Sequence, residues 1–378
     1  MIKKYWRRII AFSLPLQVLL VQIMSRHPAW VEDFYATNVY TYISQFLRHA
    51  FGSTRVPVGQ LLFYGLVLAL VIGIARRTHT LIRNKAQRSF WWKKTLVDVF
   101  FYLSCFYFFF MAMWGLNYYR APVAAITHIP AVTVSVAKLE RLCVKLIEVT
   151  NASRANIKGT PSTFIVLPPD QRQPLLQKAT LGYAAVAKKY SQLAYKPFAV
   201  KSVYVPEVMS SFRVGGIYFP FTGEANVNMD QPAFILPATI CHEMAHQIGF
   251  ASEDEANYIS FLTCRANPDP VFQYSGNLTA MRYALNRLYS QDSVAFQQLE
   301  KKLNPLVKQD LEINRQYWER FPNPFLDLTS GFYDLFLKAN GQQSGIQSYS
   351  QMVELLLGEL EKNNLEYSPA VKSAIAPE

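Results

Sequence analysis

Three long apolar runs dominate the first third of the chain, over residues 9–24, 56–75 and 95–116. The second run has no charged residue and is long enough, as a helix, to cross a hydrocarbon core of about 30 Å. The first run is shorter and is interrupted by Pro15, and the third holds Asp98 near one end. The pattern predicts three transmembrane helices, so a lipid bilayer is an expected partner.

After Arg120 the apolar positions become periodic and the predicted elements become shorter. Helical spacing and β-branched runs predict, in chain order, a helix over 134–150, a strand over 163–167, a helix over 175–193, and strands over 200–205 and 214–221. Pro237 and Gly249 are typical of the start and the end of the next helix. From residue 275 to about residue 362 the pattern is mostly helical. We therefore expect an α+β fold with three parts: a membrane region over 1–120, a mixed domain over 121–274 and a helical C-terminal subdomain over 275–378.

The net charge of +12 is confined to the membrane region. Residues 1–120 hold 15 basic and 3 acidic side chains, whereas the rest of the chain holds 23 of each kind. A nucleic-acid-binding protein spreads its basic charge over a folded face, so we expect no nucleic-acid partner. The loop over 76–94 is basic and has no acidic residue, which places it in the cytoplasm by the positive-inside rule. Everything after Arg120 should then be extracytoplasmic.

Two features of the chain leave alternatives open. The run over 9–24 follows basic residues and can be a signal peptide, although the absence of a small-residue cleavage site near Ser25 favours an uncleaved anchor. The cysteines at 105, 143, 241 and 264 lack metal-binding spacing. Buried free thiols are at least as well supported as a disulfide that joins Cys241 to one of its neighbours.

The most informative motif is His242-Glu243-Met244-Ala245-His246 on the predicted helix that begins near Pro237. Residues four positions apart share one face of a helix, so His242 and His246 can bind one metal ion, and Glu243 beside them can act as general base. Catalytic zinc commonly has three protein ligands and one open position. The sequence therefore predicts a Zn2+ site, against the alternative of two surface histidines on an amphipathic helix.

The third ligand should be a carboxylate, because no histidine follows His246. Glu253 and Glu255 compete for this role. Glu253 lies four residues before Asn257, which would then hold a ligand histidine by its second ring nitrogen. Glu255 can instead form a capping box with Ser252. We favour Glu253 and keep Glu255 as the alternative.

These residues resemble the gluzincin group of zinc metallopeptidases, which carry HExxH on one helix and ExxA[DN] on the next. Together with Trp114–Arg120 and Tyr333–Asn340, the block also resembles a family of uncharacterised membrane proteins common in Bacteroidetes. The resemblance implies a zincin-like domain over 121–274 in a multi-pass protein of the bacterial inner membrane, with that domain in the periplasm. Only six residues separate His246 from Glu253, fewer than in thermolysin-like enzymes, so Glu253 is carried over by local pattern.

The expected function is a membrane-anchored zinc metallopeptidase that hydrolyses peptides or proteins, with Glu243 moving the proton. The segment 215–228 can supply an edge strand for an extended substrate. The alternative is a non-enzymatic sensor or binding domain with a silenced or structural zinc site. An intramembrane protease is disfavoured because Ala233–Cys241 is too short to span a bilayer. Tyr258, Arg265 and Tyr274 follow the motif, but the pattern selects none of them to stabilise an oxyanion.

Overall fold

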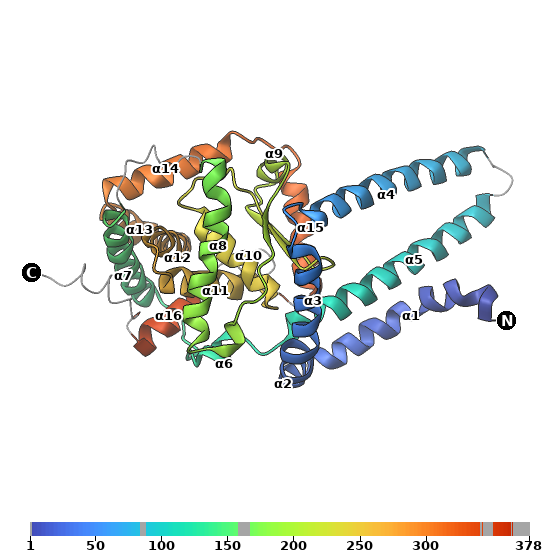
Figure 1. The fold of residues 1–378 in the computed structure, drawn as a ribbon, viewed down its shortest axis with the longest axis horizontal. Helices are drawn as coiled ribbons and strands as arrows, with labels where there is room; N and C mark the ends of the chain where they lie inside the picture. The colour runs from blue at the N-terminus through green and yellow to red at the C-terminus, as the bar shows by residue number, and fades with distance from the viewer. Residues whose placement is uncertain are drawn as a thin grey trace, which may run out of the picture.

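A computed structural model describes residues 2–83, 88–157, 167–340, 342, 351–363 and 365. Three helices project from one side of a folded body, namely α1 (Ile2–Ser25), α4 (Val58–Arg83) and α5 (Arg88–Met113) (Figure 1). Each is long and apolar enough to cross a membrane, and most of its side chains are exposed. This confirms the three predicted apolar helices. The third ends at Met113 because the chain then enters a short 3-10 turn, η3 (Gly115–Tyr119).

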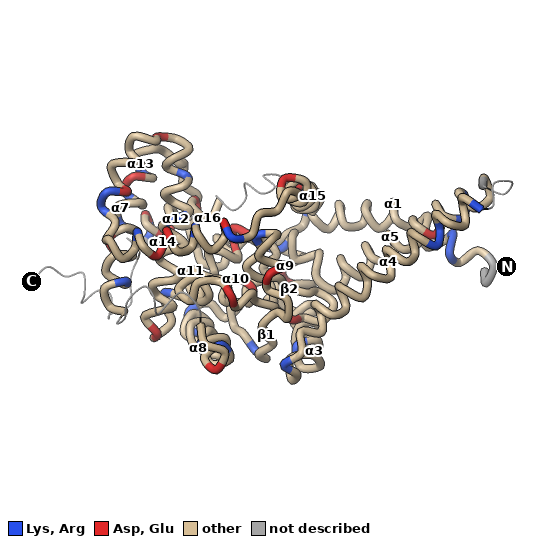
Figure 2. The backbone as a smooth tube through the Cα atoms, turned by 90° about the horizontal axis from the view of Figure 1, so that it is seen from above, with Lys and Arg blue, Asp and Glu red and all other residues tan. Residues whose placement is uncertain are grey.

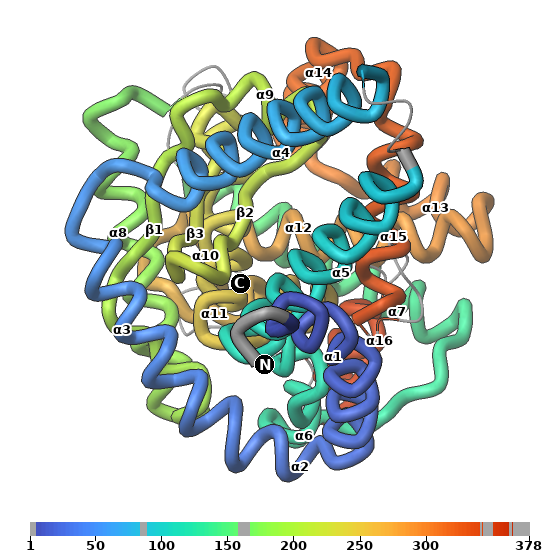
Figure 3. The backbone as a smooth tube through the Cα atoms, turned by 90° about the vertical axis from the view of Figure 1, so that its right-hand side faces the viewer, coloured from blue at the N-terminus to red at the C-terminus, as the bar shows by residue number. Residues whose placement is uncertain are grey.

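α1 and α5 pack along each other, whereas α4 stands apart from them over most of its length (Figures 1 and 3). Trp6 meets Phe101 edge to face at 5.3 Å, and the Gln17 amide donates a 2.8 Å hydrogen bond to the Ser104 hydroxyl. Lysine and arginine residues gather at the ends of these helices that lie farthest from the folded body (Figure 2).

The segment between the first two apolar helices packs against the folded body. It forms α2 (Pro28–Trp30), the π-helix η1 (Val31–Val39) and α3 (Tyr40–Gly52). Buried apolar side chains from η1 and α3, including Val31 and Tyr40, join those of Trp114 and Leu116 in a small second core. Side chains from before and after residue 120 therefore share one small core, so the boundary expected there marks a change in sequence pattern and not a break in the packing.

A small sheet lies in the centre of the folded body. Its strands are β1 (Val200–Ser202), β2 (Gly216–Phe219) and β3 (Glu224–Val227), in the order β1-β3-β2. β1 pairs with β3 in parallel, and β2 pairs with β3 in an antiparallel hairpin, with Gly216 opposite Val227. Within the described residues β2 is thus an edge strand. The expected strand over 163–167 falls on residues outside the described ranges, apart from Leu167.

Helices surround this sheet and form most of the main core. In chain order they are α6 (Val123–Thr127), α7 (Val136–Ala155), α8 (Pro169–Ala187), η5 (Ser191–Leu193), α9 (Pro206–Ser211), α10 (Leu236–Gln247), α11 (Glu253–Ala266), α12 (Pro270–Gln291), α13 (Ser293–Glu300), α14 (Pro305–Glu319), α15 (Leu326–Ala339) and α16 (Met352–Asn363). The described part is mostly helical with few strands. The expectation of an α+β fold is met only in that helices and one small sheet occur together. All four cysteines are free thiols.

A buried ion pair fastens the sheet to the start of α4. The Lys201 ammonium group contacts the carboxylate of Glu224, and both side chains are almost fully buried. Lys201 also donates to the carbonyl oxygens of Phe51 and Val56, while Glu224 accepts from the backbone amide of Gly59. A buried charge is tolerated when it is paired and hydrogen-bonded in this way. The pair fixes where α4 begins relative to the sheet.

Candidate metal centre

Local sequence features explain where α10, the helix with the HExxH motif, begins and ends. Pro237 stands in the first turn of α10, where a missing amide hydrogen costs nothing. Gly249 follows the helix with φ of +90°, a conformation that L residues with a side chain rarely adopt. A Cβ at Gly249 would also lie within 3 Å of the Tyr40 ring. The resulting sharp turn lets Glu253 follow His246 after few residues and still come back beside it.

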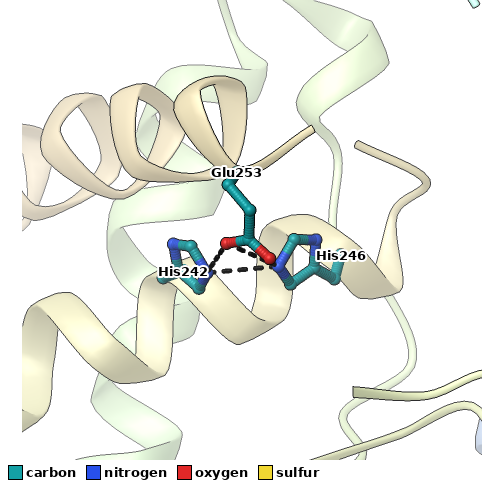
Figure 4. Close-up of side chains that lie close together, drawn as sticks. All are labelled: His242, His246 and Glu253. Carbon is teal, nitrogen blue, oxygen red and sulfur yellow. Dashed lines mark hydrogen bonds and ion pairs between the residues drawn. The ribbon is translucent and has the colours of Figure 1, made fainter. Parts of the chain in front are cut away.

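His242, His246 and Glu253 converge on one point between α10 and α11 (Figure 4). The Nε2 atoms of the two histidines are 3.1 Å apart. Oε2 of Glu253 lies 3.1 Å from Nε2 of His242 and 3.7 Å from Nε2 of His246. His242 keeps 15% of its side chain exposed, whereas His246 and Glu253 are buried. The structure thus brings Glu253, rather than Glu255, beside the two histidines.

This arrangement fits a zinc ion. Tetrahedral zinc with bonds of about 2.0–2.1 Å holds neighbouring ligand atoms about 3.3 Å apart, close to the three separations in the structure. Oε2 of Glu253 is buried and makes no hydrogen bond of good geometry among the described residues. Two imidazole nitrogens and one carboxylate oxygen form a donor set that zinc accepts in catalytic sites. A cation at this point would satisfy the buried oxygen and both nitrogens.

The electrostatics of the cluster favour a positive charge between the side chains. Burial alone would raise the pKa of Glu253, but the adjacent rings of His242 and His246 hold it well below its ordinary value. Burial alone would lower the pKa of His246, yet the Glu253 carboxylate raises it to about 9. The carboxylate therefore stays ionised and attracts either a proton or a metal ion. Metal binding at such ligands competes with protons.

A backbone carbonyl orients one of the ligand histidines. Nδ1 of His246 lies 2.8 Å from the carbonyl oxygen of Phe250, which leaves Nε2 to face the cluster. The expectation that Asn257 holds a ligand histidine is therefore wrong for His246. The amide nitrogen of Asn257 is buried and has no hydrogen-bond partner among the described residues. The turn after α10 places the Phe250 carbonyl closer to the ring than a side chain on α11 can reach.

Residues from the base of the apolar helices cap the C-terminal end of α10. The last carbonyl groups of a helix have no partner within the helix. The Tyr40 hydroxyl donates a 2.9 Å hydrogen bond to the carbonyl of Gln247, and the Trp114 indole donates one of 3.2 Å to the carbonyl of His246. The Trp114 ring also lies 6.1 Å from the His246 ring, edge to face. Segments beside the apolar helices thus hold the ligand helix.

Two tyrosines that the sequence did not assign to the site interact with Glu253. The Tyr333 hydroxyl on α15 donates a 2.6 Å hydrogen bond to Oε1 of Glu253. Tyr118 on η3 is buried, and burial together with the Glu253 charge raises its pKa. Both belong to blocks quoted above for the family resemblance, Trp114–Arg120 and Tyr333–Asn340. That resemblance was the only signal in the sequence that pointed to them.

Glu243 lies beside the cluster, as its place between the two histidines predicts. It is 4% exposed, and its Oε2 has no hydrogen-bond partner among the described residues. Burial raises the pKa of Glu243, although the nearby histidines act in the opposite direction. The backbone of Gly216 on β2 is so close that a Cβ there would lie 2.5 Å from Cγ of Glu243. A buried carboxyl group with a raised pKa is suited to accept and return a proton.

Glu255 serves a different part of the fold. Its Oε1 accepts a 2.6 Å hydrogen bond from the backbone amide of Val123 at the start of α6. Burial, with a contribution from the Asp254 charge, raises the pKa of Glu255 to about 8. The expected capping box is wrong, because Ser252 makes no side-chain cap at α11 and instead donates its hydroxyl hydrogen to Asp254.

The other polar residues considered from the sequence lie away from the centre. Tyr258 donates to Glu359, and Arg265 forms an ion pair with the same carboxylate. Tyr274 donates to Asp310. None of these three side chains has a described contact with the histidines. Their contacts connect helices within the folded body, and we assign them no part in the site.

A family model described as "Protein of unknown function (DUF3810)" matches residues 35–357, and the chain belongs to this family. The matched range includes α4, α5 and every residue of the cluster. Searches of curated proteins and of solved structures found no match to the chain. The family description assigns no activity, so function must be argued from the site itself.

Proposed function

We propose that this family member is a membrane-anchored, zinc-dependent metallopeptidase with a zincin-like domain and an extracytoplasmic active site. The observation that carries the proposal is the convergence of His242, His246 and Glu253 on one point, with Glu243 buried next to them. Three protein ligands leave one coordination position for water or substrate, which is typical of catalytic rather than structural zinc. The basic ends of the apolar helices, far from the folded body, support placement of the site outside the cytoplasm.

The roles of the residues follow from their positions. His242, His246 and Glu253 would hold the ion, which when bound polarises a carbonyl group and lowers the pKa of water to about 7. Glu243 accepts the proton of the attacking water and returns it to the departing amine nitrogen. Tyr333 holds the Glu253 carboxylate in place through its hydrogen bond.

The edge of β2 is suited to an extended peptide. In an antiparallel pair, alternate residues direct their amide and carbonyl groups toward the partner strand. Gly215 accepts a hydrogen bond from Asn228, so by this alternation Gly216 and Tyr218 direct theirs away from β3. A substrate strand paired with Gly216 would bring its backbone next to Glu243. This is the support for a peptide as substrate.

The test combines metal content with hydrolysis in the purified full-length protein. We expect about one zinc ion per chain, retained in Glu243→Gln and in the control His128→Ala, which changes an exposed histidine. His246→Ala and Glu253→Gln should lose the metal. Cleavage of a randomised peptide library should require Glu243. A folded protein that binds no added zinc would refute the metal site. Bound zinc without hydrolysis would favour the sensor or binding domain.

A further inference from the structure

β2 leads from the candidate metal centre to the apolar helices. Its first residue, Gly216, lies against Glu243. At its other end the Phe219 ring lies 6.5 Å from that of Phe63 on α4, and a Cβ at Gly59 would meet the Phe219 side chain at 2.5 Å. A strand rises about 3.3 Å per residue, so the four residues of β2 cover about 10 Å. The metal centre is therefore only a short strand away from the start of a membrane helix.

The turn after β2 contacts α5, the third of the apolar helices. The Phe221 ring lies 6.0 Å from that of Phe106, which belongs to the apolar span of α5. Phe106 is 56% exposed, and Phe221 itself is 36% exposed. The tip of the β2–β3 hairpin thus lies between the first turns of α4 and the C-terminal half of α5, on the domain side. These contacts place the tip at the boundary of the hydrocarbon region.

α15 forms a second connection between the site and the membrane helices. Its Tyr333 hydroxyl bonds to Glu253, and its Phe336 ring lies 6.0 Å from that of Phe110 in the last turn of α5. Tyr118 also contacts Phe336, at 6.5 Å between ring centroids. α15 therefore lies at the level where α5 leaves the bilayer. It borders the metal centre on the side opposite the histidine helix.

One face of α15 is strongly apolar and uncovered. Four large side chains at helical spacing form it, and they are 59–64% exposed: Phe325, Leu328, Phe332 and Leu335. The charged residues Asp327, Asp334 and Lys338 lie on a different face by the same helical spacing. Amphipathic helices of this kind bind in the interface of a bilayer with the apolar face toward the acyl chains, so a lipid surface is the occupant that fits this face.

From these contacts we infer that the substrate is a polypeptide anchored in the same bilayer, cut close to its membrane segment. This inference rests on the proposed peptidase function. A strand that pairs with β2 and extends past Phe219 reaches the membrane surface between α4 and α5. At about 3.3 Å per residue, the cleaved bond lies roughly three to six residues from the hydrocarbon boundary. Viewed along the apolar helices, α10 and α11 appear between α3, α4 and α5 (Figure 3).

The test compares two probes on the full-length protein in lipid nanodiscs. Both carry the same randomised eight-residue segment. One is joined to a 20-residue leucine–alanine membrane helix, and the other ends in a soluble lysine tail. Because a shared bilayer raises the effective concentration, the anchored probe should be cleaved about tenfold faster or more. Mass spectrometry should place its cut bonds within about six residues of the membrane helix, and Glu243→Gln should abolish cleavage.

A second measurement is independent of activity. Cys105 is replaced by serine, which leaves only buried thiols, and a fluorescent label is attached to a cysteine introduced at Leu335 or, as control, at Asp327. Lipid-borne quenchers should act on the label at 335 and spare the label at 327.

The outcomes separate this inference from the proposed function. Equal cleavage of the soluble probe, cuts far from the membrane helix, or a label at 335 that only water-soluble quenchers reach would each overturn the inference and leave the peptidase standing. Bound zinc with neither probe cleaved would overturn the peptidase function, and the substrate assignment with it.

Discussion

The Tyr333 hydroxyl donates a 2.6 Å hydrogen bond to Oε1 of Glu253, the carboxylate whose other oxygen faces the two histidines. The two residues come from helices that are far apart in the sequence, α15 and α11. A hydrogen bond of this kind fixes the direction in which a ligand presents its lone pair. Through this contact α15 can influence how strongly the three side chains bind a metal ion.

Tyr333→Phe should weaken zinc binding about tenfold, because outer-sphere partners of metal ligands typically contribute 10- to 100-fold to affinity. The ring and its contact with Phe336 would stay in place, so the fold should be retained. Zinc affinity can be measured by competition with a chelating dye. Tyr289→Phe, at a 59% exposed position, is the matched control. Unchanged affinity in Tyr333→Phe would show that the hydroxyl does not position Glu253.

Gly216→Ala should lower hydrolysis about 100-fold, since a displacement of about 1 Å in a catalytic group costs this much. The new methyl group would meet Cγ and Oε1 of Glu243 at 2.5 Å, so the carboxylate must move. The zinc content should not change, because Gly216 is not near the ligand atoms. Gly331→Ala, where nothing lies within 4 Å of the added methyl, should keep full activity. Loss of zinc in Gly216→Ala would instead indicate a general disruption.

Glu255→Gln should retain zinc and should stabilise the protein more strongly as the pH rises from about 5 to about 8. The pKa of Glu255 is raised to about 8 in the folded state, from an ordinary value of 4.5. Between these values the folded protein holds a proton that the unfolded chain has released, so wild-type stability falls with rising pH. Glutamine removes this dependence and can still accept from the Val123 amide.

The measurement for Glu255→Gln is the apparent melting temperature of both proteins across this pH range. Glu148→Gln, at an exposed side chain, serves as control and should show no trend. A constant difference between wild type and Glu255→Gln would contradict the raised pKa. Loss of zinc would move the third-ligand assignment to Glu255.

Lys201→Met should destabilise the protein by about 3–5 kcal/mol, the usual cost of leaving one member of a buried ion pair without its partner. Lys201→Met combined with Glu224→Gln should recover part of this loss, because the second change removes the unpaired charge. Unfolding in detergent, followed by far-UV circular dichroism, measures both. Lys301→Met, at an exposed lysine, should have little effect. If the double variant is no more stable than Lys201→Met, the pair is not energetically coupled.

The parts of the site that depend on local geometry could be predicted from the sequence. His242 and His246 share a helix face by spacing alone, and Glu253 returns beside them after one glycine turn. Two predictions were wrong because other partners are closer in space: that Asn257 bonds to the ring of His246, and that Ser252 and Glu255 form a capping box. The Nδ1 atom of His246 is hydrogen-bonded to the carbonyl oxygen of Phe250, and the Glu255 carboxylate accepts a hydrogen bond from the backbone amide of Val123.

The parts that depend on packing over long sequence distances could not be predicted. Tyr333 reaches Glu253 only because α15 folds back against the end of α5, and no periodicity encodes that contact. The same holds for the capping of α10 by Tyr40 and Trp114, which come from segments read only as flanks of apolar runs. Hydropathy identified the membrane helices but contained no information on what their ends would touch.

Trp114 follows directly after α5, and its indole both bonds to the carbonyl of His246 and lies against the His246 ring. A membrane helix adjusts its tilt when the thickness of the surrounding bilayer changes. Any such tilt of α5 moves the indole, and the indole moves with the ligand helix. Lipid acyl-chain length thus becomes a variable that reaches the candidate metal centre, so preparations in lipids of different length can differ in the geometry of the same three side chains.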